Sequence, residues 1–170
     1  MPRIEIDNLS DLRSLEAQVH LSAEAVLETL KPLVLAGSGM ALLRKLKFTD
    51  VVRNPLNVDS AYNFVEQLNQ TFSHLVALKA AEYVLKEHPE CRPYILRLGP
   101  IRGFDIESRN GLVVAETFAA VTHDSNSKLA KDTEKVSRSN AQHKYVFYYA
   151  ARGARPIDSV KGVKRIHLSV

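Results

Sequence analysis

The spacing of hydrophobic positions divides the chain into an N-terminal helical part and a C-terminal part in which strands and helices alternate. In the first part, apolar residues recur at helical spacing after two serines that can cap helices, Ser10 and Ser22. Pro32 and the glycines at 37 and 39 interrupt this pattern, and a short basic amphipathic segment, residues 42–48, follows. We therefore expect two helices and a short amphipathic segment in this part of the chain.

A long helix is the clearest element of the sequence. The stretch from Asp59 to Glu87 contains neither glycine nor proline, and its apolar residues recur at helical spacing. Asp59 and Ser60 are good helix N-caps. The pair His88-Pro89 should end the helix, because the residue before a proline is pushed out of the α conformation. The pattern predicts one long helix packed against the core.

After this helix, the period of the apolar positions becomes that of strands. We expect strands at residues 94–98, 103–108 and 112–121, a helix from Ser125 or Asn126 to about residue 140, and strands at residues 144–149 and 164–170. The pair Asn110-Gly111 is a strong hairpin signal. The third strand is apolar along most of its length, which is typical of burial on both faces. The expected fold class is α/β, in a single domain with a helical extension over residues 1–57 and an α-β-β-β-α-β core over residues 58–170.

Composition limits the protein classes that fit. A chain of 170 residues suits a single domain, and it has no apolar run of about 18 residues, so we expect no membrane span. The first seven residues contain neither an apolar segment nor a cleavage signature, so we do not expect secretion. Cys91 is the only cysteine, which excludes an internal disulfide and a cysteine-based zinc site and fits a reducing cytoplasm. The chain also lacks a nucleophile elbow, a P-loop and a GxGxxG motif, which argues against serine hydrolases, NTPases and dinucleotide enzymes.

Basic charge gathers at the C-terminal end. Residues 128–170 hold ten of the 23 Lys and Arg residues but three of the 19 acids, a net charge of +7, whereas the other residues carry 13 basic and 16 acidic groups, a net −3. Such asymmetry is typical of a polyanion partner, although single-sign patches also occur without one. On the expected helix after residue 125, four basic residues share a stripe that either contacts phosphates or faces solvent: Lys128, Lys131, Lys135 and Arg138.

Carboxylates in the expected strands are the strongest candidates for chemistry. Glu116 lies in the middle of an apolar run, where an unpaired carboxylate is costly and is usually satisfied by a metal or a basic partner. Asp105 and Glu107 are two residues apart, so they should share one face of a strand. The tight turn would place these three acids on neighbouring strands. There they would hold Mg²⁺ or form structural ion pairs, with Arg97 or Arg102 as the partner of Glu116.

The order of a long helix, a strand, two acid-bearing strands, a helix and a strand resembles the core of the PD-(D/E)xK nuclease superfamily, which includes restriction endonucleases and Holliday-junction resolvases. The resemblance covers roughly residues 59–150 and is carried by Gly103-Phe104-Asp105 and, eleven residues on, by Ala115-Glu116-Thr117-Phe118. It implies a restriction-endonuclease-like fold with a mixed sheet, and Asp105 and Glu116 as ligands of Mg²⁺, with Mn²⁺ as a substitute. Families of this kind often add a helix glutamate, for which Glu66 or Glu82 would serve.

The sequence departs from the family pattern at the lysine. Two residues after the glutamate stands Phe118, which cannot position a water or neutralise a phosphate, and the nearest replacements are Lys128 and Lys131 on the following helix. The proline of the motif is also shifted, to Pro100. The resemblance therefore implies an atypical Mg²⁺-dependent endonuclease that hydrolyses DNA phosphodiester bonds, with the two acids as catalytic residues and Glu107 in support.

Two other functions fit the same residues. The first is a non-catalytic nucleic-acid-binding or protein-interaction module on the same fold, whose basic C-terminal segment binds while the acids form ion pairs. The second is an assembly factor that forms a homodimer through the helices of residues 11–48. Neither requires a membrane partner. Aromatic residues within 144–149 would stack on unpaired bases or pack in the core, where strand aromatics usually lie.

Overall fold

The computed structural model describes residues 3–35, 38–54, 56–99, 101–153 and 157–170. Over these residues, the chain forms a seven-stranded sheet in the order β1-β4-β5-β6-β7-β9-β8 and a two-stranded sheet of β2 and β3. The larger sheet contains β1 (Arg3–Ile6), β4 (Tyr94–Arg97), β5 (Ile106–Ser108), β6 (Val113–Thr122), β7 (His143–Arg152), β8 (Asp158–Val160) and β9 (Val163–His167). The smaller one contains β2 (Asp50–Asn54) and β3 (Asn57–Asn63).

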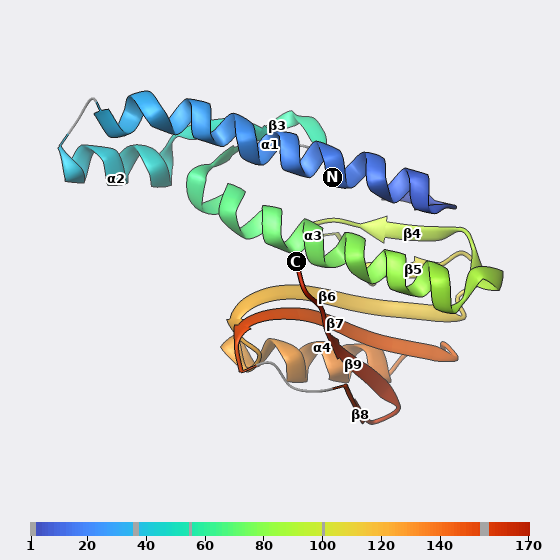
Figure 1. Cartoon of the computed structure of the whole chain (residues 1–170). Helices are drawn as coiled ribbons and strands as arrows, with labels where there is room; N and C mark the ends of the chain where they lie inside the picture. The colour runs from blue at the N-terminus through green and yellow to red at the C-terminus, as the bar shows by residue number, and fades with distance from the viewer. Residues whose placement is uncertain (1–2, 36–37, 55, 100, 154–156) are drawn as a thin grey trace.

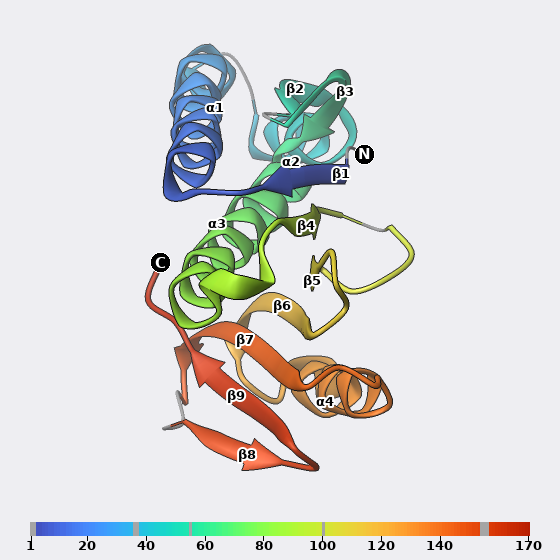
Figure 2. The same cartoon turned by 90° about the vertical axis from the view of Figure 1, so that its right-hand side faces the viewer.

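Helices cover both faces of the larger sheet (Figures 1 and 2). The helices are α1 (Leu9–Leu35), α2 (Gly39–Phe48), α3 (Phe64–Glu87) and α4 (Lys128–Ser137), with single 3₁₀ turns at Pro89–Cys91 and Ser125–Ser127. Helices α1 and α3 lie side by side on one face, and α4 packs against β6 and β7 on the other. Within the described residues, no helix is both long and apolar enough to span a membrane.

The sheet buries a separate core on each face. Along β6, Val113 and Ala115 point into the core shared with α1 and α3, whereas Val114 and Phe118 point into the core shared with α4. Strand β6 is therefore buried on both faces, as its apolar sequence predicts. The aromatic residues of β7 are mostly core as well, since Tyr145, Phe147 and Tyr148 are buried (rather than free to stack on bases).

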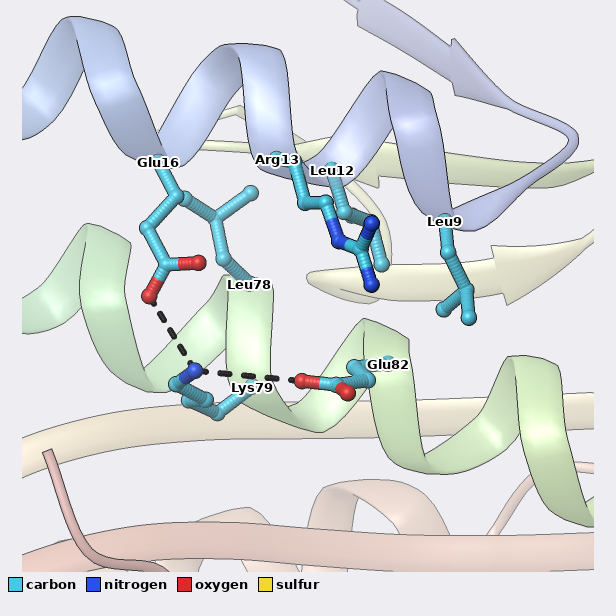
Figure 3. A pocket seen from close by; sticks show the side chains of 7 residues that line it. All are labelled: Leu9, Leu12, Arg13, Glu16, Leu78, Lys79 and Glu82. Atoms are coloured by element: carbon cyan, nitrogen blue, oxygen red, sulfur yellow. Dashed lines mark ion pairs between the residues drawn. The ribbon is translucent and has the colours of Figure 1, made fainter.

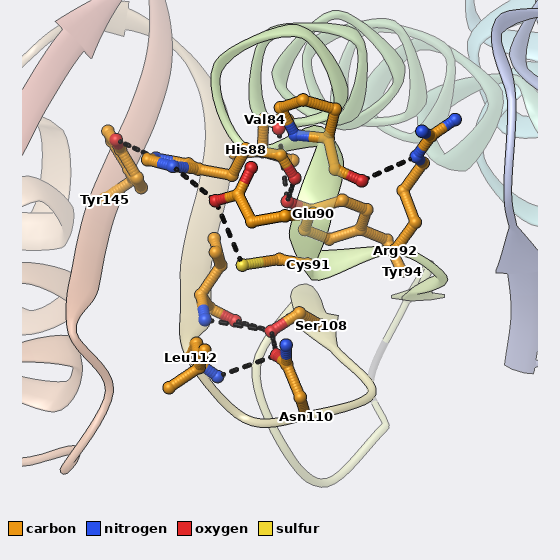
Figure 4. Close-up of polar contacts among 12 residues, drawn as sticks. Val84, His88, Glu90, Cys91, Arg92, Tyr94, Ser108, Asn110, Leu112 and Tyr145 are labelled. Carbon is orange, nitrogen blue, oxygen red and sulfur yellow. Dashed lines mark hydrogen bonds and ion pairs between the residues drawn. The ribbon is translucent and has the colours of Figure 1, made fainter.

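The order of elements in the C-terminal part confirms the α/β class. Helix α3 is followed by β4, β5, β6, α4 and β7, as the sequence predicts. The strands β4, β5 and β6 are antiparallel, whereas β6 pairs with β7 and β7 with β9 in parallel, so the sheet is mixed. The predicted hairpin turn lies between β5 and β6, where Gly111 adopts a positive φ of 71° and Asn110 Oδ1 accepts a hydrogen bond from the amide of Leu112 (Figure 4).

The C-terminal end of α3 is tied to two strands (Figure 4). The hydroxyl of Tyr94 in β4 donates to the carbonyl oxygens of Val84 (3.1 Å) and His88 (2.9 Å). His88 Nε2 lies 2.7 Å from the hydroxyl of Tyr145 in β7. The predicted end of the helix at His88-Pro89 is confirmed, and the same residues anchor α3 to the sheet.

The predicted break between two N-terminal helices is wrong, because α1 runs without interruption from Leu9 to Leu35. Asn8 Oδ1 accepts from the amides of Ser10 and Asp11, so Asn8 takes the capping role that the sequence gives to Ser10. Ser22 is buried inside the helix, and its hydroxyl accepts a hydrogen bond from Gln67 of α3. A serine without a neighbouring glycine or proline does not stop a helix whose residues on either side, such as Val19 and Val26, pack against the rest of the protein. Pro32 also lies within α1, in its last turns.

The region of residues 1–57 is not wholly helical. Arg3–Ile6 forms edge strand β1 on β4, and Asp50–Asn54 pairs with Asn57–Asn63. Residues 59 and 60 therefore lie in a strand rather than at the start of the long helix. Helix α3 begins at Phe64, where the side chains and amides of Asn63 and Glu66 form a reciprocal capping box.

Smaller differences concern the C-terminal elements. The second strand of the core is shorter than predicted, and residue 105 precedes it. Helix α4 begins at Lys128, after a 3₁₀ turn, and ends at Ser137. Strand β8 was not expected from its sequence. The shifted proline of the motif, Pro100, lies outside the described residues.

Replacement of Asn63 tests where α3 begins. We expect Asn63→Ala to lower the free energy of unfolding by about 1 kcal/mol, because it removes the acceptor for the amide of Glu66. Asn63→Ser keeps a capping oxygen and should restore most of the loss. Chemical denaturation followed by circular dichroism measures both. Equal stability of Asn63→Ala and the wild type would contradict the observed helix start.

Candidate functional site

The hairpin of β5 and β6 brings two of the predicted acids together. Ile106 pairs with Ala115 in antiparallel register, so Asp105 lies across from Glu116 one step further along the ladder. Asp105 Oδ2 accepts hydrogen bonds from the amide (2.7 Å) and the hydroxyl (2.9 Å) of Thr117. These bonds hold the loop before β5 against the middle of β6.

A lysine of α4 is the ion-pair partner of Glu116. Glu116 is 3% exposed, and its Oε1 lies 2.6 Å from Nζ of Lys135. The same ammonium group donates to the carbonyl oxygen of Gly103 (2.7 Å) and lies 5.4 Å from the centre of the Phe104 ring. Lys135 therefore joins α4, β6 and the loop before β5 at one point.

A second lysine–acid pair of α4 lies beside the first. Lys128 Nζ is 2.9 Å from Oδ1 of the buried Asp132, one helical turn away. The second oxygen of Asp132 is buried and has no hydrogen-bond partner among the described residues. Together with Asp105 and Glu116, Asp132 makes three acids against two lysines. The cluster is therefore negative when every group is ionised.

The pKa values of the three acids are all raised. Burial raises the pKa of Glu116 to about 7, with a further increase from the neighbouring charge of Asp105 and an opposing decrease from Lys135. Burial also raises the pKa of Asp105 and that of Asp132. Burial disfavours the charge of Lys128, but the hydrogen bond to Asp132 and the negative charges of Asp132, Asp105 and Glu116 together outweigh burial, and the pKa of Lys128 is raised. The cluster thus favours an additional positive charge, either a proton or a cation.

The two acids at the hairpin are the candidate ligands for a hard divalent cation. In the described part of the chain, no group of three or more His, Cys, Asp or Glu residues has a metal-binding arrangement. Mg²⁺, however, is commonly bound through one or two carboxylates together with waters and substrate phosphates. The hydrogen bonds of Asp105 and Glu116 engage Oδ2 and Oε1 respectively, so one oxygen of each carboxylate remains for such a ligand. Asp105 and Glu116 are therefore the residues that could hold Mg²⁺ or Mn²⁺.

Glu107 does not join this pair of carboxylates. Its Oε2 lies 2.8 Å from Nη2 of Arg97. The other terminal nitrogen of Arg97, Nη1, donates to the carbonyl oxygen of Phe104. The expected partner of Glu116, Arg97, is thus the partner of Glu107, and Lys135 takes the place beside Glu116. Glu107 thus forms a structural ion pair with Arg97.

Glu82 is also separated from the two acids. It lies on α3 in a surface pocket that faces α1, where it pairs with Lys79 (3.8 Å; Figure 3). It also pairs with Lys86, one turn further along α3 (2.6 Å). These ion pairs and hydrogen bonds lower the pKa of Glu82. The alternative helix glutamate, Glu66, is engaged in the capping box of α3. The structure therefore brings neither glutamate to Asp105.

The predicted basic stripe of α4 divides into different environments. Lys128 and Lys135 turn toward the acid cluster. Lys131 is exposed and donates to the carbonyl oxygen of Asn126, and Arg138 pairs with Glu134 on the surface. The binding of nucleic acid by this stripe stays a prediction.

The sequence places Lys135 in a surface stripe, where Asp132 only offsets the basic charge, and His74 reads as an ordinary helix residue; it singles out neither Asp132 nor His74 as a site residue. A signal for Asp132 exists in the helix periodicity, because it falls among the buried positions Leu129, Thr133 and Val136. His74 lies within a long helix whose apolar and polar residues do not separate cleanly, so its burial could not be read from the pattern.

No protein-family model, curated protein or solved structure matches this chain.

Stability as a function of pH tests the environment of Glu116. Because its pKa is raised from 4.5 to about 7, the folded protein binds this proton more tightly than the unfolded chain does. The resulting stabilisation is complete below pH 4.5 and is lost as the pH rises through 7. Glu116→Gln mimics the protonated form, so its stability relative to the wild type should increase by about 2 kcal/mol between pH 5 and pH 8. Urea denaturation at each pH measures this difference.

A second variant provides the matched comparison. Lys135→Met removes the ammonium group that lowers the pKa of Glu116, so its stability should fall more steeply with rising pH than that of the wild type. Parallel pH profiles of the wild type and Glu116→Gln would contradict the raised pKa.

Proposed function

We propose that this protein is a metal-dependent nuclease of an atypical kind, which hydrolyses phosphodiester bonds in DNA. The observation that carries the proposal is the position of Lys135. Its ammonium group lies 2.6 Å from Glu116, although position 118, where the nuclease pattern has its lysine, is occupied by Phe118. A lysine from α4 thus supplies the group that the strand lacks.

The arrangement of the strands supports the same proposal. Helix α3, the antiparallel strands β4, β5 and β6, the crossover helix α4 and the parallel strand β7 follow the order that the nuclease resemblance implies. Phe118 is buried and stacks on Tyr148, with 5.6 Å between ring centres. The residue at the lysine position therefore contributes to the core under α4. The positive charge beside Glu116 comes instead from Lys135 of α4.

Each residue of the cluster has a role in this proposal. Thr117 fixes the orientation of Asp105 through two hydrogen bonds. Asp105 and Glu116 would hold a Mg²⁺ ion, which when bound supplies a Lewis acid and lowers the pKa of a bound water. The ammonium group of Lys135 can orient the attacking water and stabilise the negative charge that develops on the phosphate. Lys128, at the edge of the cluster, is placed to bind a neighbouring phosphate.

Nicking of supercoiled plasmid in Mg²⁺ or Mn²⁺ tests the proposal. The wild type should nick in either metal and not in EDTA. Asp105→Asn and Lys135→Gln should each lower the rate at least a hundredfold, because they remove a metal ligand and the positive charge beside it. Lys131→Gln is the comparison on the same helix: this exposed lysine belongs to the predicted basic stripe and does not contact the acids, so its loss should weaken DNA binding, and the nicking rate at saturating plasmid should stay within twofold of the wild type.

Two results would count against the assignment. Equal losses in Lys131→Gln and Lys135→Gln would mean that α4 acts through its general charge rather than through the lysine beside Glu116. A wild type inactive in both metals would contradict the nuclease proposal. The better account would then be a non-catalytic nucleic-acid-binding module in which Lys135 and Glu116 form a structural ion pair.

Homodimer formation through the N-terminal helices stays a prediction. Several large apolar side chains of α1 and α2 are exposed, among them Leu27 (53%), Leu35 (87%), Leu43 (61%) and Phe48 (76%), and surfaces of this kind often mark protein contacts. Sedimentation equilibrium should give the mass of a dimer for the wild type and that of a monomer for the double variant Leu35→Glu, Leu43→Glu. A monomeric wild type at micromolar concentration would contradict the expectation.

A further inference from the structure

A polar pocket of about 340 Å³ adjoins the acid cluster. It lies between α3, the end of β4, the loop before β5, the middle of β6 and the start of α4. The lining side chains that can contact a polar ligand include Gln70, Ser73, His74, Arg97, Asp105 and Lys128. Arg97 and Lys128 are each paired with an acid, so the pocket presents hydrogen-bond donors and cations whose charge is partly balanced.

His74 is the unexplained group in this pocket. Its side chain belongs to a residue that is 1% exposed, and neither ring nitrogen has a hydrogen-bond partner among the described residues. A buried polar group without a partner costs about 1–3 kcal/mol, so its retention is typical of a site that a ligand completes. Burial lowers the pKa of His74 to about 4, which leaves the neutral ring with one donor and one acceptor.

A second pocket, of about 450 Å³, continues from the first. The two share Ser73, and Thr117 in the first and Ala119 in the second lie two residues apart on β6, or about 7 Å. The second pocket is mainly apolar. Its walls include Leu68, Phe72, Val121 and Tyr149, and alanines of β6 and β7 leave space between them.

We propose that the two pockets form one subsite for a single unpaired nucleotide of a nucleic-acid strand. The sugar-phosphate would lie in the polar pocket, with a hydrogen bond to His74, and the base would enter the apolar pocket beside Phe72 and Tyr149. Aromatic side chains beside basic residues are the usual means of holding unpaired bases, and Arg97 and Lys128 line the polar pocket. Phe72 is 44% exposed, so its ring is accessible to a base.

The apolar pocket selects an unpaired base for a steric reason. In a duplex, each base is covered on both faces by its neighbours, and it reaches a pocket only after it leaves the stack. A base in a single strand or at a frayed end is already unpaired, so it can enter the pocket without the free-energy cost of leaving a duplex. That the ligand has a phosphodiester backbone rests on the proposed function. The subsite adds that the strand is unpaired where it meets the acid cluster.

Fluorescence anisotropy with a short single-stranded DNA and the matching blunt duplex tests this subsite. The titrations are carried out in EDTA, so that binding is measured apart from metal-dependent cleavage. We expect the wild type to bind the single strand at least tenfold more tightly than the duplex. Phe72→Ala should weaken binding of the single strand about tenfold, the effect of losing one base–aromatic stack, and should leave binding of the duplex unchanged.

Two further variants make the result specific. Val65→Ala shortens another exposed apolar residue of α3 (45% exposed) that does not line the pocket, and it should bind both DNAs as the wild type does. His74→Asn should weaken binding of the single strand, and circular dichroism establishes that the variant is folded. If it does not fold, the comparison of Phe72→Ala with Val65→Ala decides alone.

The outcomes separate this inference from the nuclease proposal. Equal affinity for the two DNAs, or equal losses on both in Phe72→Ala, would overturn the subsite even if the plasmid is nicked. A strong preference for the single strand that depends on Phe72 would support the subsite even if no nicking occurs, in which case only the nuclease proposal fails.

Discussion

The site depends on one interaction between the sheet and the helix packed on it, the ion pair between Glu116 in β6 and Lys135 in α4. A buried carboxylate requires a partner, because its desolvation penalty is several kcal/mol. No residue of its own strand supplies that partner, and the crossover helix does. The same ammonium group bonds the carbonyl oxygen of Gly103, so the loop that carries Asp105 is fixed by the contact that satisfies Glu116. The ammonium group of Lys135 therefore fixes the loop that carries Asp105 and also balances the charge of Glu116.

A protein whose buried acids outnumber their cationic partners gives up stability to keep them. Replacing such groups with apolar residues is often neutral or stabilising, so the presence of Asp105, Glu116 and Asp132 together points to a use for their charge. The unpartnered nitrogens of His74 point the same way. Asp105, His74 and Lys128, the partner of Asp132, line the same pocket. Strain that accumulates at one place in a fold is a common sign of a binding site.

The elements that can be predicted from the sequence are those with a local cause. The C-terminal order of strands and α4, and the hairpin turn, follow from periodicity and from Asn110-Gly111. The start of α3 could not be chosen in this way, because Asp59, Ser60 and Asn63 all have capping side chains and only the pairing of β3 with β2 decides among them. Strand β1 depends wholly on its partner β4. In the site, the acids were predictable from their apolar surroundings, whereas the partner of Glu116 is nineteen residues away and required the packing of α4.

The origin of Lys135 in a crossover helix has a consequence for folding. The hairpin of β5 and β6 is local, so it can bring Asp105 and Glu116 together early. The ammonium group arrives only when α4 has packed and β7 has paired in parallel with β6, and such non-local pairing is slow because chain closure precedes the contacts that reward it. Until then, two carboxylates face each other without a counter-charge. We therefore expect the site to assemble in two stages, with the two acids brought together before their counter-charge arrives.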